Sequence, residues 1–230
     1  CAVRLASLCS GGKDSTSSIA RAKEKGHQVV CLITMHPIAD DSLLFHYPNS
    51  WVTAYIGDAL QIPLLGFPVS GRSKEDEVAS LQQAIIRAKS LYSIDGVVFG
   101  GISSKYQKEA FEQICSRHDL GAIAPLWNID PFTHMKGLVD DGYKIMIVAV
   151  SAMGLGKEWL GATLDKDSLH KLAALSKRYG FNLAFEGGEA ETLVTDCPLF
   201  IKRLEIKRAD TRWDGQRGIF EIREVALVEK

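Results

Sequence analysis

Six consecutive residues near the start of the chain have the types and spacing of an anion-binding turn, Ser10-Gly11-Gly12-Lys13-Asp14-Ser15. Because its two glycines lack a Cβ atom, the backbone can approach a phosphate closely and adopt positive φ. The amide hydrogens of such a turn point at the ligand, with Lys13 beside them as a point charge. Ser10 and Ser15 add hydroxyl donors. The hexapeptide therefore predicts a site for phosphate groups.

The residue after the lysine separates this turn from a Walker A loop. A Walker A loop has four residues between its glycines and Ser or Thr directly after its lysine. Here the glycines are adjacent and Asp14 follows Lys13. Asp14 either caps the following helix or holds a Mg²⁺ ion.

A second chemical cluster lies at 185–196, where Glu186, Glu189 and Glu191 accompany two glycines, Thr192 and an aspartate. We expect an acidic, tightly turned loop, which can bind magnesium, an ammonium group or a cationic acceptor. A solvated surface turn explains the same composition. The residues alone leave both explanations open.

The elements around the first turn alternate between strands and helices. An apolar run at 3–9 leads into the turn, helix-forming residues occupy 18–25, and a second apolar run follows at 28–34. Strand, helix and strand at this spacing predict a parallel sheet with its ligand at the carboxyl ends of the strands. We therefore expect adenine or ribose contacts from the backbone groups of Thr34, Met35 and His36.

Later segments extend this sheet. Strands are expected at 62–67, 95–101 and 121–128, and helices at 51–60, 75–92 and 102–115. The helix at 75–92 has one apolar face, formed by Val78, Leu81, Ile85, Ala88 and Leu91. Gly100 and Gly101 end the fourth strand at the edge where the phosphate turn lies, so we expect both to contact the nucleotide.

Two connecting segments supply candidate substrate-binding residues. The loop at 40–49 is long enough to cover a site and contains Ser42 and His46. A lone loop histidine is as often a solvated or capping side chain. After the second glycine pair, the predicted cleft residues are Ser103, Ser104, Lys105, Tyr106 and Gln107. A capped strand-end turn is the competing interpretation of this segment.

An irregular stretch around Pro125 predicts a domain boundary near residue 130. A Rossmann-like α/β domain at 1–130 is expected to precede a smaller α+β domain at 131–230. In the second domain we expect helices at 133–141 and 168–179, the latter capped by Asp167, and a strand at 143–150. The segment 204–228 reads as a hairpin with its turn at 213–218.

Composition excludes several classes of protein. The 230 residues are 46% hydrophobic and 24% charged with a net charge of −1, so no broad basic surface for nucleic acid or anionic membrane is expected. The five cysteines form no Cys-x-x-Cys pair, which favours a reducing, cytoplasmic location. No apolar stretch approaches the length of a membrane span.

The strand, Ser10–Ser15 turn and helix resemble the PP-loop ATP pyrophosphatase superfamily, which has a HUP-type sheet. A narrower resemblance, to the diphthine–ammonia ligase family, covers nearly the whole chain. It is carried by Ser10–Ser15, Ser42–Asn49, Gly101–Gln107, Pro125–Trp127, Gly154–Gly156 and Glu186-Gly-Gly-Glu-Ala-Glu-Thr192. This resemblance implies an AMP-forming ligase that makes a C–N bond.

The resemblance further implies the reaction and its partners. Diphthine, a modified histidine on translation elongation factor two, would be adenylated by ATP with Mg²⁺ and then amidated by ammonia or ammonium, releasing AMP and pyrophosphate. Catalytic roles fall to Lys13, Glu186, Glu189 and Glu191. The expected ATP-binding residues are Ser10, Gly11, Gly12, Lys13, Asp14, Ser15, Thr34, Met35, His36, Gly100 and Gly101, with Asp14 as a candidate Mg²⁺ ligand. The expected substrate-binding residues are Ser42, His46, Ser103, Ser104, Tyr106, Gln107, Gly187, Gly188 and Thr192.

Two positions depart from the family pattern. Ala110 stands where members usually carry an arginine, for which Lys105 or Lys108 can substitute, and Ala190 stands where many have an aromatic residue. The alternatives are a PP-loop enzyme that modifies tRNA by thiolation or lysidine chemistry, and a universal-stress-type module that binds ATP without turnover. We expect no stable nucleic-acid partner and no membrane, and allow for a homodimer.

Overall fold

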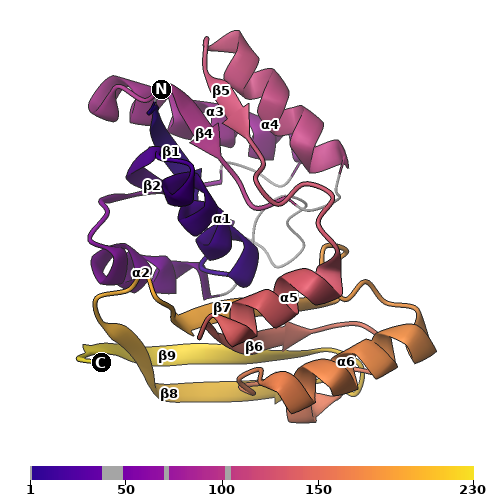
Figure 1. Ribbon diagram of the computed structural model, residues 1–230. Helices are drawn as coiled ribbons and strands as arrows, with labels where there is room; N and C mark the ends of the chain where they lie inside the picture. Colours follow the sequence, from indigo (N-terminus) through magenta and orange to yellow (C-terminus); the bar gives the residue numbers. More distant parts are fainter. Residues whose placement is uncertain (1, 38–48, 70–72, 102–104) are drawn as a thin grey trace. The chain divides into compact units, whose positions relative to one another are not determined.

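The computed structural model describes residues 2–37, 49–69, 73–101 and 105–230. The chain forms two compact units, 1–127 and 128–230. Figure 1 shows a sheet with its own helices in each unit. The two units are described separately below.

The first unit is built on five parallel strands, which confirms the predicted fold class. They are β1 (Arg4–Leu8), β2 (Gln28–His36), β3 (Leu64–Pro68), β4 (Gly96–Val98) and β5 (Gly121–Ile123). The sheet order is β3-β2-β1-β4-β5. Because β1 is central, the turn that follows it emerges between the ends of β2 and β4.

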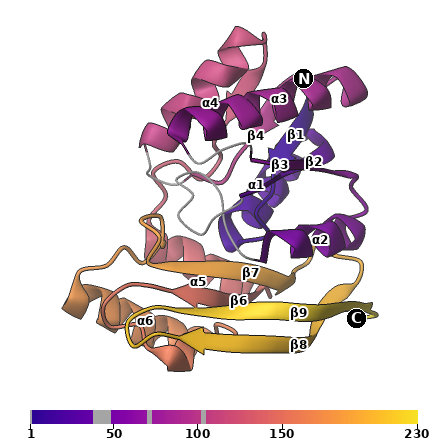
Figure 2. The same cartoon turned by 180° about the vertical axis from the view of Figure 1, so that it is seen from behind.

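Helices cover both faces of this sheet. They are α1 (Lys13–Glu24), α2 (Thr53–Leu60) after the short 3₁₀ helix η1 (Asn49–Val52), α3 (Lys74–Tyr92) and α4 (Lys105–Arg117). The apolar core under α3 and α4 includes Ala6, Cys31 and Val97. Since strand side chains alternate between faces, the neighbouring buried Leu5 and Leu32 point to the other face, where α1 lies. Figures 1 and 2 show α1 on one side of the sheet and α3 with α4 on the other.

One predicted core position in α3 is wrong. Leu81, Ile85 and Ala88 are fully buried, but the Leu91 side chain is 47% exposed. Tyr92 packs against the core in its place. The reason is helical geometry: the buried stripe continues from residue 88 by a step of four, whereas a step of three turns Leu91 toward solvent.

The second unit contains a four-stranded antiparallel sheet. Its strands are β6 (Lys144–Val150), β7 (Ala190–Asp196), β8 (Arg203–Trp213) and β9 (Gly218–Val228), in the order β7-β6-β9-β8. The predicted hairpin is confirmed as β8 and β9, paired from Arg203 with Val228 to Trp213 with Gly218. The 3₁₀ helix η2 (Lys157–Trp159) lies between β6 and α6.

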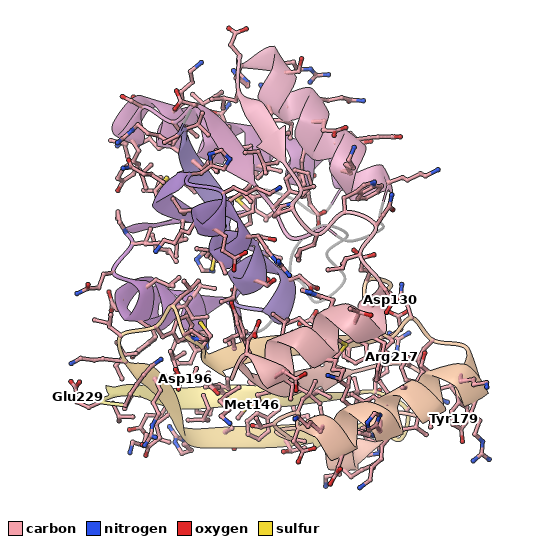
Figure 3. The ribbon with its side chains drawn as sticks, in the orientation of Figure 1. Asp130, Met146, Tyr179, Asp196, Arg217 and Glu229 are labelled. Atoms are coloured by element: carbon pink, nitrogen blue, oxygen red, sulfur yellow. The ribbon has the colours of Figure 1, made fainter. Side chains whose placement is uncertain are left out.

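Two helices, α5 (Pro131–Asp140) and α6 (Lys166–Tyr179), lie over one face of this sheet (Figure 3). The N-cap of α5 is Asp130, whose carboxylate accepts the Thr133 N–H at 2.8 Å. The predicted Asp167 cap of α6 is wrong. Asp165 is the cap, because it forms a capping box in which its carboxylate and backbone N–H both bond to Ser168. No helix within the described ranges is long and apolar enough to cross a membrane.

Candidate active site

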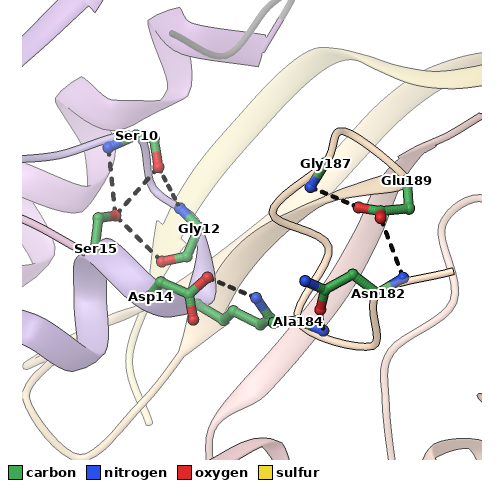
Figure 4. A network of polar contacts seen from close by, with 9 residues as sticks. Ser10, Gly12, Asp14, Ser15, Asn182, Ala184, Gly187 and Glu189 are labelled. Atoms are coloured by element: carbon green, nitrogen blue, oxygen red, sulfur yellow. Dashed lines mark hydrogen bonds and ion pairs between the residues drawn. The ribbon is translucent and has the colours of Figure 1, made fainter. Parts of the chain in front are cut away.

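The turn between β1 and α1 is closed by bonds among its own hydroxyl and backbone groups (Figure 4). The Ser10 Oγ accepts the Gly12 N–H at 3.3 Å and lies 3.3 Å from the Ser15 Oγ. The Ser15 hydroxyl also lies 3.2 Å from the Gly12 carbonyl oxygen. Gly11 has φ of +81°, a conformation that favours glycine. The turn thus keeps its shape through side chains on either side of the glycine pair.

Gly12 is the N-cap residue of α1, so the alternative in which Asp14 caps this helix is wrong. Lys13 begins the helix and is only 2% exposed. Its ammonium group lies 2.6 Å from the Asp14 carboxylate. The lysine is therefore a buried cation held at the positive end of a helix dipole.

These features fit a phosphate-bearing ligand. The glycine cap supplies no side-chain hydrogen bond to the first turn of α1, and the helix N-terminus and Lys13 both favour an anion. The described residues offer few protein ligands for Mg²⁺, because they contain no group of three potential metal-ligating side chains. Mg²⁺ commonly binds through one or two carboxylates together with substrate phosphates and waters, a role that Asp14 matches.

The segment that follows β4 lies against this turn. Gly100 packs on the backbone of Asp14 and Ser15 so closely that a side chain has no room. The Ser18 hydroxyl of α1 lies 3.4 Å from the Phe99 carbonyl oxygen. Of the two predicted glycines, Gly100 therefore packs against the turn. A Cβ on Gly101 would instead make an ordinary van der Waals contact with the Phe99 ring.

The end of β2 is tied to the end of β1. The Thr34 hydroxyl donates to the Cys9 carbonyl oxygen at 2.7 Å, and the Cys9 N–H donates to Ile33. Burial raises the pKa of the Cys9 thiol to about 11, so it is not a thiolate nucleophile at neutral pH. Met35 is buried. The Thr34 hydroxyl thus links the end of β2 to the end of β1.

His36 is the polar side chain at this end of β2. Its Nδ1 lies 2.9 Å from the hydroxyl of Ser50, a residue that sequence analysis missed. Gly66 on β3 makes room for the imidazole, since a Cβ there would lie 2.9 Å from Nε2. Burial lowers the pKa of His36, which favours the neutral ring.

In the second unit, the acidic segment divides into a turn and a strand. Glu186, Gly187, Gly188 and Glu189 lie in the turn before β7. Glu191 and Thr192 lie within β7, paired with Ala149 and Ile147 of β6, so the predicted loop extending to 196 is wrong. The β-branched and apolar run at 192–195 forms strand instead, because it packs as a pleated, half-buried surface.

A neighbouring residue was missed by sequence analysis. Val150 of β6 pairs with Ala190 of β7, which brings the next residue, Ser151, beside the acidic turn. The Ser151 N–H and hydroxyl donate to the carbonyl oxygens of Glu189 and Gly188, at 2.8 and 2.5 Å. The only sequence signal nearby is the Gly154-Leu155-Gly156 segment that follows it.

Several predicted substrate-binding positions fall outside the described residues: Ser42, His46, Ser103, Ser104 and the side chains of Tyr106 and Gln107. Of the two lysines considered as substitutes for the arginine absent at Ala110, Lys105 is exposed. Lys108 lies 5.0 Å from the Trp127 ring centroid and pairs with Glu112 at 2.6 Å. Ala190, the second departure, is buried in β7.

The parallel sheet with a glycine turn, a buried lysine and a helix N-terminus defines the first unit as a nucleotide-binding α/β domain of the PP-loop type. The sequence matches the diphthamide synthase N-terminal domain over residues 3–122 and the diphthamide synthase C-terminal domain over residues 130–228. The chain therefore belongs to the diphthamide synthase family.

Curated relatives with the name diphthine–ammonia ligase, a carbon–nitrogen ligase, span most of the chain. The Homo sapiens protein is 31% identical over 226 residues, covering 90% of this chain and 84% of its own. The Danio rerio protein is 32% identical, covering 91% and 88%. The predicted tRNA methyltransferase subunit from Methanocaldococcus jannaschii aligns in structure with a TM-score of 0.39 and 16% identity, over 84% of this chain and 98% of its own.

Proposed function

We propose that this chain catalyses the ATP-dependent amidation of diphthine on translation elongation factor two, with ammonia as the nitrogen donor. Support comes from membership of the diphthamide synthase family across both units together with the phosphate-binding geometry of residues 10–15. The single observation that carries the proposal is the buried Lys13 at the N-terminus of α1, directly after a glycine N-cap.

The chemistry proceeds in two displacements. A carboxylate oxygen of diphthine attacks the α-phosphorus of ATP, and the bond to the β-phosphate oxygen breaks, so pyrophosphate leaves. The nitrogen of ammonia then attacks the acyl carbon of the resulting acyl-adenylate. AMP leaves with the bonding electron pair, and the proton lost from nitrogen passes to solvent or to a nearby carboxylate. The products are diphthamide, AMP and pyrophosphate.

In this proposal, the charged residues of the two units have different roles. In the first unit, Lys13 and the first-turn amides of α1 stabilise negative charge that develops on the departing pyrophosphate. Asp14 is the proposed ligand for Mg²⁺, which supplies further charge neutralisation on the phosphates when bound. In the second unit, the 186–192 segment forms the acceptor side, where the carboxylates of Glu186 and Glu191 can attract a cationic diphthine or an ammonium ion.

An assay that resolves AMP plus pyrophosphate from ADP plus phosphate tests this proposal. The purified protein is incubated with ATP and Mg²⁺, with ammonium and diphthine-bearing elongation factor added singly and together. We expect stoichiometric AMP and amide only when both are present. AMP formation with tRNA instead would overturn the proposal in favour of a tRNA-modifying enzyme, and ATP binding without cleavage would favour a binding module.

A further inference from the structure

Both carboxylate oxygens of Glu189 are engaged within its own turn (Figure 4). Oε1 accepts the Asn182 N–H at 3.1 Å, and Oε2 accepts the Gly187 N–H at 2.7 Å. Hydrogen bonds from backbone amides to an ionised carboxylate are roughly twice as strong as neutral ones. The Glu189 side chain therefore spans the turn from its first residue to its glycine pair.

The same turn contains a strained residue. Phe185 has φ of +64°, an uncommon conformation for an aromatic residue. Its buried ring lies 6.4 Å from that of Phe181, and its carbonyl oxygen accepts the Gly188 N–H at 3.3 Å. Because such a conformation persists only where its surroundings enforce it, the turn depends on the bonds that cross it.

A second set of bonds fastens the turn to the segment after β6. The carbonyl oxygen of Glu189 accepts the N–H groups of Ser151 and Ala152 at 2.8 and 3.2 Å. The Ser151 hydroxyl donates to the Gly188 carbonyl oxygen at 2.5 Å. Glu189 thus uses its side chain to close the turn and its backbone to anchor it.

The glycine at position 187 is explained by this arrangement. A Cβ atom on Gly187 would lie 2.8 Å from Oε1 of Glu189. A side chain there would displace the carboxylate from the Gly187 N–H. The Glu-Gly-Gly-Glu segment therefore has an internal structural requirement that accounts for one glutamate and one glycine without reference to a ligand.

We propose that Glu189 is a positioning residue, whose carboxylate holds the 182–189 turn in the conformation that binds the acceptor. Ser151 is a second positioning residue, because its hydroxyl bonds the same turn at Gly188. This inference rests on the proposed function, which assigns the acceptor side to the 186–192 segment. It replaces the predicted direct catalytic role of Glu189 and leaves contact with the acceptor to the neighbouring glutamates.

Amide hydrogen exchange on the protein without substrates tests the structural half of this proposal. Glu189→Gln keeps one acceptor oxygen and loses the other, so exchange at Asn182 or Gly187 should accelerate roughly tenfold. Ser151→Ala removes only the bond to Gly188 and should accelerate exchange in 182–189 several-fold. The control is Thr195→Val, which removes a 3.3 Å bond to the Lys144 carbonyl oxygen at the opposite end of the β6–β7 pair and should leave this turn unchanged.

Kinetics test the functional half. A positioning role predicts that Glu189→Gln and Ser151→Ala both raise the KM for the diphthine-bearing protein while the KM for ATP and the melting temperature stay near wild type. A contact role predicts that Glu189→Gln abolishes kcat with unchanged exchange in 182–189 and that Ser151→Ala matches wild type. That second pattern would overturn the proposal.

Failure of the proposed function and failure of the positioning role of Glu189 would give different results. A wild-type protein without ligase activity would contradict the proposed function, whereas amide exchange still decides whether Glu189 closes the turn. If Glu189→Gln does not fold, Ser151→Ala carries the test, because it changes no carboxylate. Wild-type exchange and kinetics in Ser151→Ala would then count against the positioning role.

Discussion

Gly100 and Asp14 lie so close together that a Cβ atom on Gly100 would stand 2.8 Å from the carbonyl carbon of Asp14. The same Cβ would lie 2.8 Å from the Ser15 backbone nitrogen. Real Cβ atoms do not approach backbone atoms this closely, and backbone cannot move aside as a flexible side chain can. The segment after β4 therefore helps to fix the position of the first turn of α1.

We predict that Gly100→Ala displaces this turn. Overpacking against backbone should lower the free energy of unfolding by about 1–3 kcal/mol and should weaken ATP binding. Denaturant unfolding and calorimetric ATP titration measure the two effects. The control is Gly101→Ala, whose Cβ would lie 3.6 Å from the Phe99 ring, an ordinary van der Waals contact. Equal effects from both substitutions would contradict the prediction.

Removal of the Lys13 charge should affect chemistry far more than folding. Lys13→Met keeps an apolar stem of similar length. In the proposed reaction, it removes the positive charge that stabilises the departing pyrophosphate and should lower kcat about 10²- to 10³-fold. Pyrophosphate release under saturating ATP is the measurement. Lys23→Met, on the exposed face of the same helix, should retain wild-type activity. A Lys13→Met protein with wild-type kcat would exclude a role for Lys13 in charge stabilisation.

Acidification should destabilise the protein through His36. Burial lowers its pKa in the folded state, so the unfolded chain binds the proton more readily. This contribution to stability is present above the unfolded pKa of about 6.5 and is lost as pH falls through the folded pKa. The free energy of unfolding, measured by urea titration from pH 7 to 5, should fall less in His36→Gln than in wild type. His170→Gln, on the exposed side of α6, serves as the control; if it flattens the curve as much as His36→Gln does, the assignment to His36 fails.

The glycine at 154 is predicted to be required for the loop after β6. Its φ is +94°, and a Cβ there would overlap the Tyr179 ring at the end of α6. Gly154→Ala should therefore lower the melting temperature by more than Gly142→Ala. Gly142 has a similar φ of +86° but open space around it, so its substitution reports the backbone cost alone, about 1 kcal/mol. Similar losses from both would mean that Tyr179 moves aside freely.

Much of the first unit could be predicted from the sequence, because its strands and its turn follow from patterns of neighbouring residues. Apolar runs between glycine turns are typical of buried parallel strands, and the five strands confirm that pattern. The hexapeptide at residues 10–15 combines glycine conformation, helix start and lysine charge, all of which are properties of adjacent residues. Its placement between β1 and α1 follows from chain order alone.

Other features depended on tertiary contacts that no local pattern contains. Ser151 lies beside Glu189 because Val150 of β6 pairs with Ala190 of β7, although Ser151 and Gly188, which share a hydrogen bond, are 37 positions apart in the chain. Ser50 meets His36 only because Gly66 on the neighbouring strand leaves room for the ring. Lys108, a candidate substitute for the arginine absent at position 110, contacts the Trp127 ring and pairs with Glu112, and neither contact is evident from the local sequence.

The sequence by itself determined which chemical groups this chain carries and in what order: a turn of glycines with a lysine, an acidic segment and an alternation of strands and helices. Only the tertiary structure decided how the glutamates divide. Glu191 lies in a strand, while Glu189 closes a turn through the N–H groups of Asn182 and Gly187. The physical reason is that residue type fixes charge and hydrogen-bonding capacity, whereas strand register and turn geometry decide which of those groups are satisfied within the protein.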